Sequence, residues 1–119
     1  MREVIFRAWY KKGGYMMPVE EIDFNQGLIN KTGIWRWFHE VELMQYTGLK
    51  DKNGVKIFEG DVLFHPLQGR RKVFYPYSET VASYGLRNID NGFGSTLQDS
   101  HAVWEVIGNI YENEDLLEG

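Results

Sequence analysis

The sequence predicts a mainly β protein: a small SH3-like antiparallel barrel with an added N-terminal β-hairpin and little helix. Three observations indicate this class. Aromatic residues make up 15 % of the 119 residues, and aromatic side chains favour strands. Thirteen glycines against three prolines indicate frequent tight turns. Short apolar or alternating segments lie between these turns along the whole chain, as in barrels and small sandwiches.

The N-terminal residues 1–38 predict two hairpins. Residues 4–10 are β-branched and aromatic, and a Gly-Gly pair separates them from a second extended run over 15–19. Residues 27–30 and 34–38 flank a Lys-Thr-Gly turn and predict the second hairpin.

Residues 41–111 are expected to form the barrel-like core. The Asn-Gly pair at 53–54 predicts a tight turn after the strand over 41–46. Gly60 and Asp61 predict a sharp bend that begins a new strand, because glycine adopts positive φ at little cost. We expect the Asp61 side chain to accept hydrogen bonds from nearby turn amides.

The later part of the chain is less regular. Residues 72–75 and 80–84 predict short strands, 90–95 a loop, and 102–111 the most strand-like segment. Residues 112–119 form an acidic tail that predicts one helical turn. Three side chains of the last strand are available to the core: Trp104, Val106 and Ile110.

Length and composition restrict the class of protein. A chain of this length fits one domain over 1–119. Thirteen basic and 17 acidic side chains give a net charge of −4, which provides no long-range attraction for nucleic acid or an anionic membrane. The absence of cysteine excludes disulfides, thiolate metal sites and cysteine nucleophiles. No apolar run has the length of a signal peptide or a membrane span, so we expect a cytoplasmic protein without membrane contact.

The sequence offers no convincing catalytic or metal-binding set. Two carboxylate pairs, Glu40 with Glu42 and Glu59 with Asp61, would each share one strand face, but such pairs are usually solvated. Three histidines lie far apart without the paired spacing of zinc motifs: His39, His65 and His101. We therefore predict no enzymatic activity, no metal and no cofactor.

A basic cluster followed by aromatic side chains gives one functional hypothesis. Cationic side chains neutralise phosphates and aromatic faces stack on unpaired bases, so this segment could bind single-stranded nucleic acid. The competing interpretation, a charged hairpin turn followed by a core strand, is the one we favour. The residues concerned are Arg70, Arg71, Lys72, Phe74, Tyr75 and Tyr77.

The aromatic residues of the N-terminal hairpins give the other hypothesis. They exceed what one small core readily covers, and exposed Trp and Tyr are typical of protein interfaces. We therefore expect protein–protein contacts and a homo-oligomer, although packing within the core is an equally good reading of the same side chains. The residues concerned are Trp9, Tyr10, Tyr15, Trp35 and Trp37.

Three blocks of sequence carry a resemblance to a known family. Residues 5–9, residues 41–54 continuing into 57–62, and residues 104–113 resemble the signature blocks of the YopX family of phage and prophage proteins. The resemblance implies a protein of a bacterial host cell. It implies no activity, catalytic residue or cofactor that could be transferred. Together with the residues above, it favours an accessory protein that acts by binding.

Overall fold

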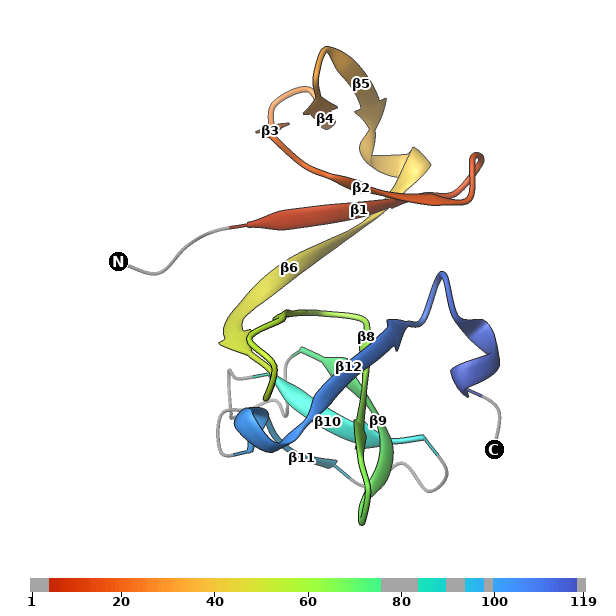
Figure 1. Ribbon diagram of the computed structural model, residues 1–119. Coiled ribbons are helices and arrows are strands. Elements are labelled where there is room, and N and C mark those ends of the chain that lie inside the picture. The colour runs from red at the N-terminus through yellow and green to blue at the C-terminus, as the bar shows by residue number, and fades with distance from the viewer. Residues whose placement is uncertain (1–4, 76–83, 90–93, 98–99, 118–119) are drawn as a thin grey trace. The chain divides into compact units, whose positions relative to one another are not determined.

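The computed structural model describes residues 5–75, 84–89, 94–97 and 100–117 (Figure 1). It confirms the mainly β class, since the regular structure of these residues consists of antiparallel strands and three short 3₁₀ segments. The chain forms two compact units, Met1–Tyr46 and Thr47–Gly119, which we describe separately. A single domain over 1–119 stays our prediction for the whole chain.

The first unit contains both predicted hairpins. Strand β1 (Phe6–Tyr10) pairs antiparallel with β2 (Tyr15–Pro18) and, on its other edge, with the beginning of β6 (Val41–Lys50). Strands β4 (Leu28–Lys31) and β5 (Ile34–Trp37) form the second hairpin.

A third strand joins this second hairpin. Strand β3 (Glu21–Asp23) pairs with the free edge of β4, so a three-stranded sheet has the order β3-β4-β5 with β5 at one edge. The 3₁₀ segment η1 (Phe38–Glu40) follows β5. One face of this sheet supplies Ile22 and Ile29 to the core of the unit, which also contains Ala8 and Tyr10.

The turn between β4 and β5 is a tight two-residue loop. Lys31 and Ile34 are cross-strand partners, and the residues between them both have positive φ, 51° at Thr32 and 81° at Gly33. Positive φ at both central positions is the geometry of a type I′ turn, whose twist matches that of the flanking strands. Glycine adopts it freely, whereas a β-branched threonine is strained there.

The second unit confirms the predicted small antiparallel barrel, as a sheet that curls into a half-barrel. Strand β7 (Lys56–Phe58) neighbours β6, and five further strands have the order β11-β10-β9-β8-β12 (Figure 1). The strands of this sheet are β8 (Asp61–His65), β9 (Gly69–Phe74), β10 (Gly85–Asn88), β11 (Gly94–Thr96) and β12 (Glu105–Asn109). The 3₁₀ segments are η2 (His101–Val103) and η3 (Glu114–Leu117).

The core of this unit lies on one face of the curled sheet. Trp104 is its largest fully buried side chain, and Val106 packs against the cluster as the sequence predicted. Seven buried side chains form the cluster: Ile57, Leu63, Val73, Tyr84, Leu86, Leu97 and Trp104.

Two segment predictions in this unit were wrong. Residues 94 and 95, predicted as the end of a loop, belong to β11. Pairing with β10 supplies the hydrogen bonds of this strand, and the Gly-Ser-Thr sequence alone gives no strand signal. Residues 102–103, predicted as strand, belong to η2, which precedes Trp104. Of the strand predicted over 80–84, residues 80–83 lie outside the described residues, as do residues 90–93 of the predicted loop.

Candidate functional site

The polar residues of the recognised sequence blocks stabilise turns and strand ends of the second unit. Asp51 is buried, and its Oδ1 accepts hydrogen bonds from the backbone N–H of Asn53 at 2.8 Å and Val55 at 2.9 Å. Its Oδ2 accepts the N–H of Val106 at 2.9 Å, 55 residues away. Burial alone would raise the pKa of Asp51, but the hydrogen bonds from Val106, Val55 and Asn53 outweigh it and lower this pKa below its usual value.

Asp61 and Thr47 have the same role at the next bend. Asp61 Oδ2 accepts the N–H of Phe58 at 2.7 Å, and Gly60 has a φ of 87°, so the predicted bend and its Asp61 hydrogen bond are confirmed. The buried Thr47 hydroxyl donates to the carbonyl oxygen of Ile57 at 2.8 Å.

The polar residues of the block over 104–113 stabilise the turn that follows β12. Asn109 Oδ1 accepts the N–H groups of Tyr111 at 3.0 Å and Glu112 at 2.8 Å, and Asn109 Nδ2 donates to Glu112 Oε1 at 2.9 Å. A Cβ atom added to Gly108 would collide with the Asn113 side chain. These residues hold the chain as it leaves β12, which is an architectural role.

The three histidines have different neighbours. The Nδ1 atom of His101 is 2.6 Å from the carbonyl oxygen of Lys50, the ring of His65 lies 5.4 Å from that of Trp104, and His39 stacks on Trp37. The described residues contain no group of three His, Cys, Asp or Glu side chains that could hold a metal ion.

The members of the two carboxylate pairs predicted from the sequence lie in different environments. Glu40 accepts the N–H of Trp37 at 2.9 Å, and Glu42 forms an ion pair with Lys11 at 3.2 Å. Asp61 is buried in its bend, whereas Glu59 is half-buried. The predictions that the protein has no enzymatic activity, no metal and no cofactor stay predictions.

The basic and aromatic segment is divided between two faces of β9. Arg71 lies on the core side with Val73, with its guanidinium carbon 5.7 Å from the ring centre of Trp104. Tyr75 contacts Tyr84, with ring centres 5.0 Å apart. Tyr77 lies outside the described residues.

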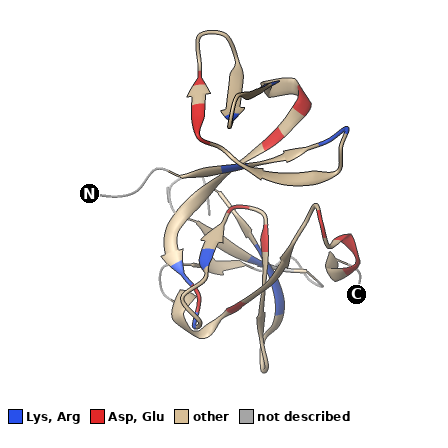
Figure 2. Ribbon diagram, turned by 45° about the horizontal axis from the view of Figure 1, so that its top comes forward, with Lys and Arg blue, Asp and Glu red and all other residues tan. Residues whose placement is uncertain are grey.

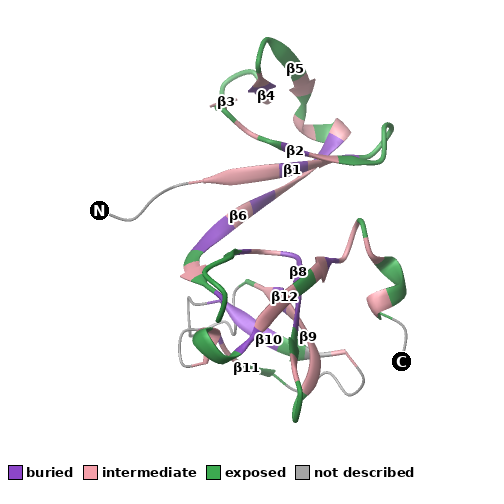
Figure 3. Cartoon of the chain, viewed as in Figure 1, coloured by how far each residue is buried: buried purple, intermediate pink, exposed green. Residues whose placement is uncertain are grey.

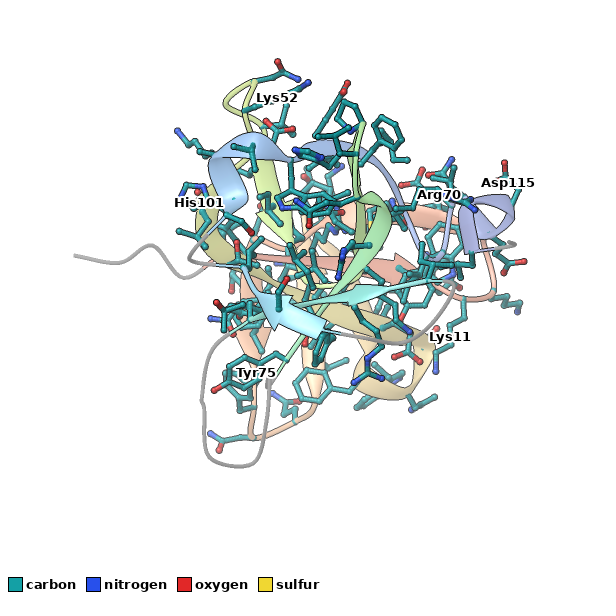
Figure 4. The ribbon with its side chains drawn as sticks, turned by 90° about the horizontal axis from the view of Figure 1, so that it is seen from below. Lys11, Lys52, Arg70, Tyr75, His101 and Asp115 are labelled. Carbon is teal, nitrogen blue, oxygen red and sulfur yellow. The ribbon has the colours of Figure 1, made fainter. Side chains whose placement is uncertain are left out.

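The opposite face of β9 carries Arg70, Lys72 and Phe74. Arg70 donates to the carbonyl oxygen of Leu116 at 2.6 Å, and Figure 4 shows it beside the η3 segment that carries Asp115. This segment before the C-terminus begins with two acidic residues, and that part of it is red in Figure 2.

Sequence reasoning missed a further basic residue of that face. Arg87 on β10 is the cross-strand partner of Lys72, and its guanidinium carbon lies 4.4 Å from the ring centre of Phe74. We call Lys72, Phe74 and Arg87 the basic face. No signal along the chain places Arg87 here, because the pairing of β10 with β9 brings it in.

The five aromatic residues proposed as an interface also lie on different faces. Tyr10 is buried, with Tyr15 5.2 Å away and the guanidinium carbon of Arg36 4.1 Å from its ring centre. The hydrogen bond between Arg36 and the Tyr15 hydroxyl raises the pKa of Arg36 further. Trp9 is half-buried on β1.

Trp35 and Trp37 are different, because they are 46 % and 48 % exposed. They lie on the face of β5 away from the core, and Figure 3 shows most of this strand as exposed. The strand register places four further side chains on the same face of the sheet. We call this set the Trp surface: Glu21, Asp23, Leu28, Asn30, Trp35 and Trp37.

The fold and these surfaces together define a small β protein whose recognised sequence blocks stabilise turns and whose outward faces carry aromatic and basic side chains. A family model described as "YopX protein" matches residues 5–118. The chain therefore belongs to the YopX family, as its sequence blocks predicted.

A solved structure supports the fold. The crystal structure of protein EF1440 from Enterococcus faecalis is similar to this chain with a TM-score of 0.69 and 25 % sequence identity, over 99 % of this chain and 100 % of that one. No match was found among the curated proteins. Within the described residues, none of the helical segments has the length and apolar character needed to cross a membrane.

Proposed function

We propose that this protein is a phage- or prophage-encoded accessory protein that acts by binding, through protein–protein contacts and self-association, in the cytoplasm of the bacterial host. The observation that carries the proposal is the pair Trp35 and Trp37, nearly half exposed side by side on an edge strand. Trp is enriched among the residues that contribute most to protein interfaces. Membership of the YopX family supports the biological context, because the resemblance described above implies a phage or prophage protein.

The energetic argument rests on the area of the two indoles. Covering the exposed halves of Trp35 and Trp37 removes roughly 200 Å² of apolar surface from water, or about 5 kcal/mol. That is comparable with the loss of freedom on association, so neighbouring contacts must add to it. Leu28, the half-buried cross-strand partner of Trp37 on the same face, is available for this.

Sedimentation velocity tests the proposal. We expect the wild-type protein to sediment as an oligomer at micromolar concentration and the Trp35→Ser/Trp37→Ser variant to sediment as a monomer. Leu67→Ser is the matched control, because Leu67 is 90 % exposed in the second unit and its loss removes a similar apolar group elsewhere. A wild-type protein that is monomeric throughout, or an oligomer that survives the double substitution, contradicts the proposed role of this surface.

A second candidate function is binding of single-stranded nucleic acid, which the basic face favours. Lys72 and Arg87 are cross-strand partners, and like charges placed opposite each other destabilise a sheet. Neither forms an ion pair with the described carboxylates. An anion between them would relieve this repulsion, and Phe74 could hold Arg87 flat for phosphate or base stacking.

Fluorescence anisotropy with a labelled oligothymidylate of about 20 nucleotides tests this candidate. We expect Lys72→Gln and Arg87→Gln each to weaken binding and to reduce the slope of log affinity against log salt by about 0.7. Lys12→Gln, the same charge change on an exposed residue of the first unit, is the control and should change neither. Absence of binding by the wild type at low salt rules this function out.

A further inference from the structure

The side chains of the Trp surface are arranged in the same order in each cross-strand row, from acidic on β3 to aromatic on β5. The register of β3, β4 and β5 produces two cross-strand rows, and each begins with a carboxylate on β3 and ends with an indole on β5. Directly opposite residues in such rows have Cβ atoms roughly 5 Å apart, so the members of a row are in reach of one ligand group. The rows are Glu21, Asn30 and Trp35, and Asp23, Leu28 and Trp37.

The middle of the first row contains an unsatisfied polar atom. Asn30 is only 8 % exposed, and its Oδ1 has no hydrogen-bond partner in the described part of the chain. Its Nδ2 donates to Glu21 Oε1 at 3.4 Å, so the amide group is oriented by the carboxylate beside it. A buried acceptor without a donor costs about 1–3 kcal/mol, and a ligand that supplies an N–H would recover that cost.

The carboxylates of Asp23 and Glu21 differ in how many hydrogen bonds they accept within the protein. Asp23 accepts the N–H groups of Asn25 at 3.0 Å and Gln26 at 3.1 Å, and also the Gln26 side-chain amide at 2.9 Å. Glu21 is exposed and accepts the single long hydrogen bond from Asn30. Glu21 is therefore the carboxylate available to a ligand, whereas Asp23 contributes negative charge.

We infer that this surface binds a basic side chain, arginine before lysine, carried by a partner polypeptide, which deepens the protein-binding function proposed above and rests on it. A guanidinium group lying over Trp35 gains from the negative face of the indole. Its N–H donors satisfy Asn30 Oδ1 and pair with Glu21 at the other end of the row. Arginine presents five donors in a planar fork, so one side chain meets both acceptors, which a lysine ammonium does less well.

Nuclear magnetic resonance with short peptides tests the inference directly. The probe is the capped peptide Gly-Ser-Arg-Ser-Gly, with matched peptides that carry Lys, Gln or Glu in place of Arg. The chain has four tryptophans, so four indole N–H signals report on the sites. We expect the Arg peptide to shift the Trp35 and Trp37 signals with saturation in the millimolar range, the Lys peptide to bind about threefold more weakly, and the Gln and Glu peptides to bind not at all.

Two variants connect the binding to the row. Glu21→Gln should weaken Arg-peptide binding about fivefold and reduce its salt dependence, with the charge of Asp23 remaining. Glu114→Gln, the same change on an exposed residue of η3, is the control and should leave binding unchanged. Asn30→Leu should abolish selective binding while raising the midpoint of thermal unfolding, because it removes a buried acceptor that has no donor. A fall in that midpoint would show instead that Asn30 is a structural residue.

Other outcomes separate this inference from the function on which it rests. Equal shifts with the Arg and Gln peptides, or no shift with any peptide, overturn the basic-ligand inference. If sedimentation still shows an oligomer that depends on Trp35 and Trp37, the proposed function survives that result. If an oligothymidylate shifts the Trp35 and Trp37 indole signals and the Arg peptide does not, the inference is also overturned. That result favours a nucleic-acid ligand.

Discussion

The buried polar side chains of the two units differ in how they are hydrogen-bonded. In the second unit, the buried polar residues Asp51, Asp61 and Asn109 each accept backbone N–H groups at a turn or a strand end. In the first unit, Asn30 has a buried oxygen without a donor, and Thr32 has a positive φ that a β-branched residue disfavours.

This contrast separates residues that build the fold from residues available for contact. A buried polar group that is fully hydrogen-bonded stabilises one conformation. A buried acceptor without a donor lowers the stability of the fold. Its position beside exposed indoles suggests that it is retained for binding. The buried polar oxygens named in the second unit thus stabilise its turns and strand ends, and the first unit carries the surface we propose for binding.

The largest expected effect is at Asp51. Replacement of Asp51 by Ala leaves three backbone N–H groups without their acceptor, so we expect a loss of about 4 kcal/mol in the free energy of unfolding, measured with urea. Asp115→Ala, on the exposed η3 segment, is the control and should change this free energy little. A loss at Asp51 no larger than that of the control would remove the contrast between the units.

A smaller loss is expected at Gly108. An added Cβ would overlap the Asn113 side chain, so Gly108→Ala should destabilise the protein by about 2 kcal/mol in the same urea measurement. In an Asn113→Gly background the same substitution should cost clearly less, because the nearest obstacle is gone. Equal costs in both backgrounds would mean that the side chain of Asn113 is not what confines Gly108.

The first unit should respond in the opposite direction at Thr32. Asparagine tolerates positive φ better than threonine, so Thr32→Asn should stabilise the protein by about 1 kcal/mol, seen as a higher midpoint of thermal unfolding. The hydrogen bond of the Thr32 hydroxyl to Glu20 is lost, but both residues are exposed. Thr32→Val, which keeps the branch, should give no gain, and a gain there would refute the strain argument.

The smallest effect is the dependence of stability on pH that Asp51 contributes. Its pKa is lowered in the folded state, so its contribution is complete above the unfolded-state pKa of about 4 and is lost as pH falls through the folded-state value. Urea titrations from neutral to acidic pH should therefore show a steeper loss of stability for the wild type than for Asp51→Asn, whose side chain does not titrate. Parallel curves would show that other carboxyl groups account for the acid sensitivity.

Local chemistry made much of the fold predictable. The Asn-Gly pair at 53–54 marks the turn between β6 and β7, and Gly60 with Asp61 marks the start of β8, because both signals act within a few residues. The alternation of Trp35 and Trp37 on one strand face followed from the period of a strand. Strand β11 was not predicted, because it is a strand only through its hydrogen bonds to β10, which lies earlier in the chain.

The candidate sites were less predictable for the same reason. Six consecutive or near-consecutive residues from Arg70 to Tyr77 suggested one basic and aromatic cluster, but alternation along β9 divides it, and Arg87 arrives from another strand. Asn30 gave no signal in the sequence, since its importance depends on its burial and on the residues opposite it in the sheet.

By itself, the sequence determined the β class, the positions of most turns and the membership of the YopX family, because each depends on residues close together in the chain. The tertiary structure decided which side chains share a face: Glu21, Asn30 and Trp35 in one row, and Lys72 beside Arg87 in another. Such neighbours are set by the register between strands, and register arises from the packing of the whole sheet rather than from any one segment.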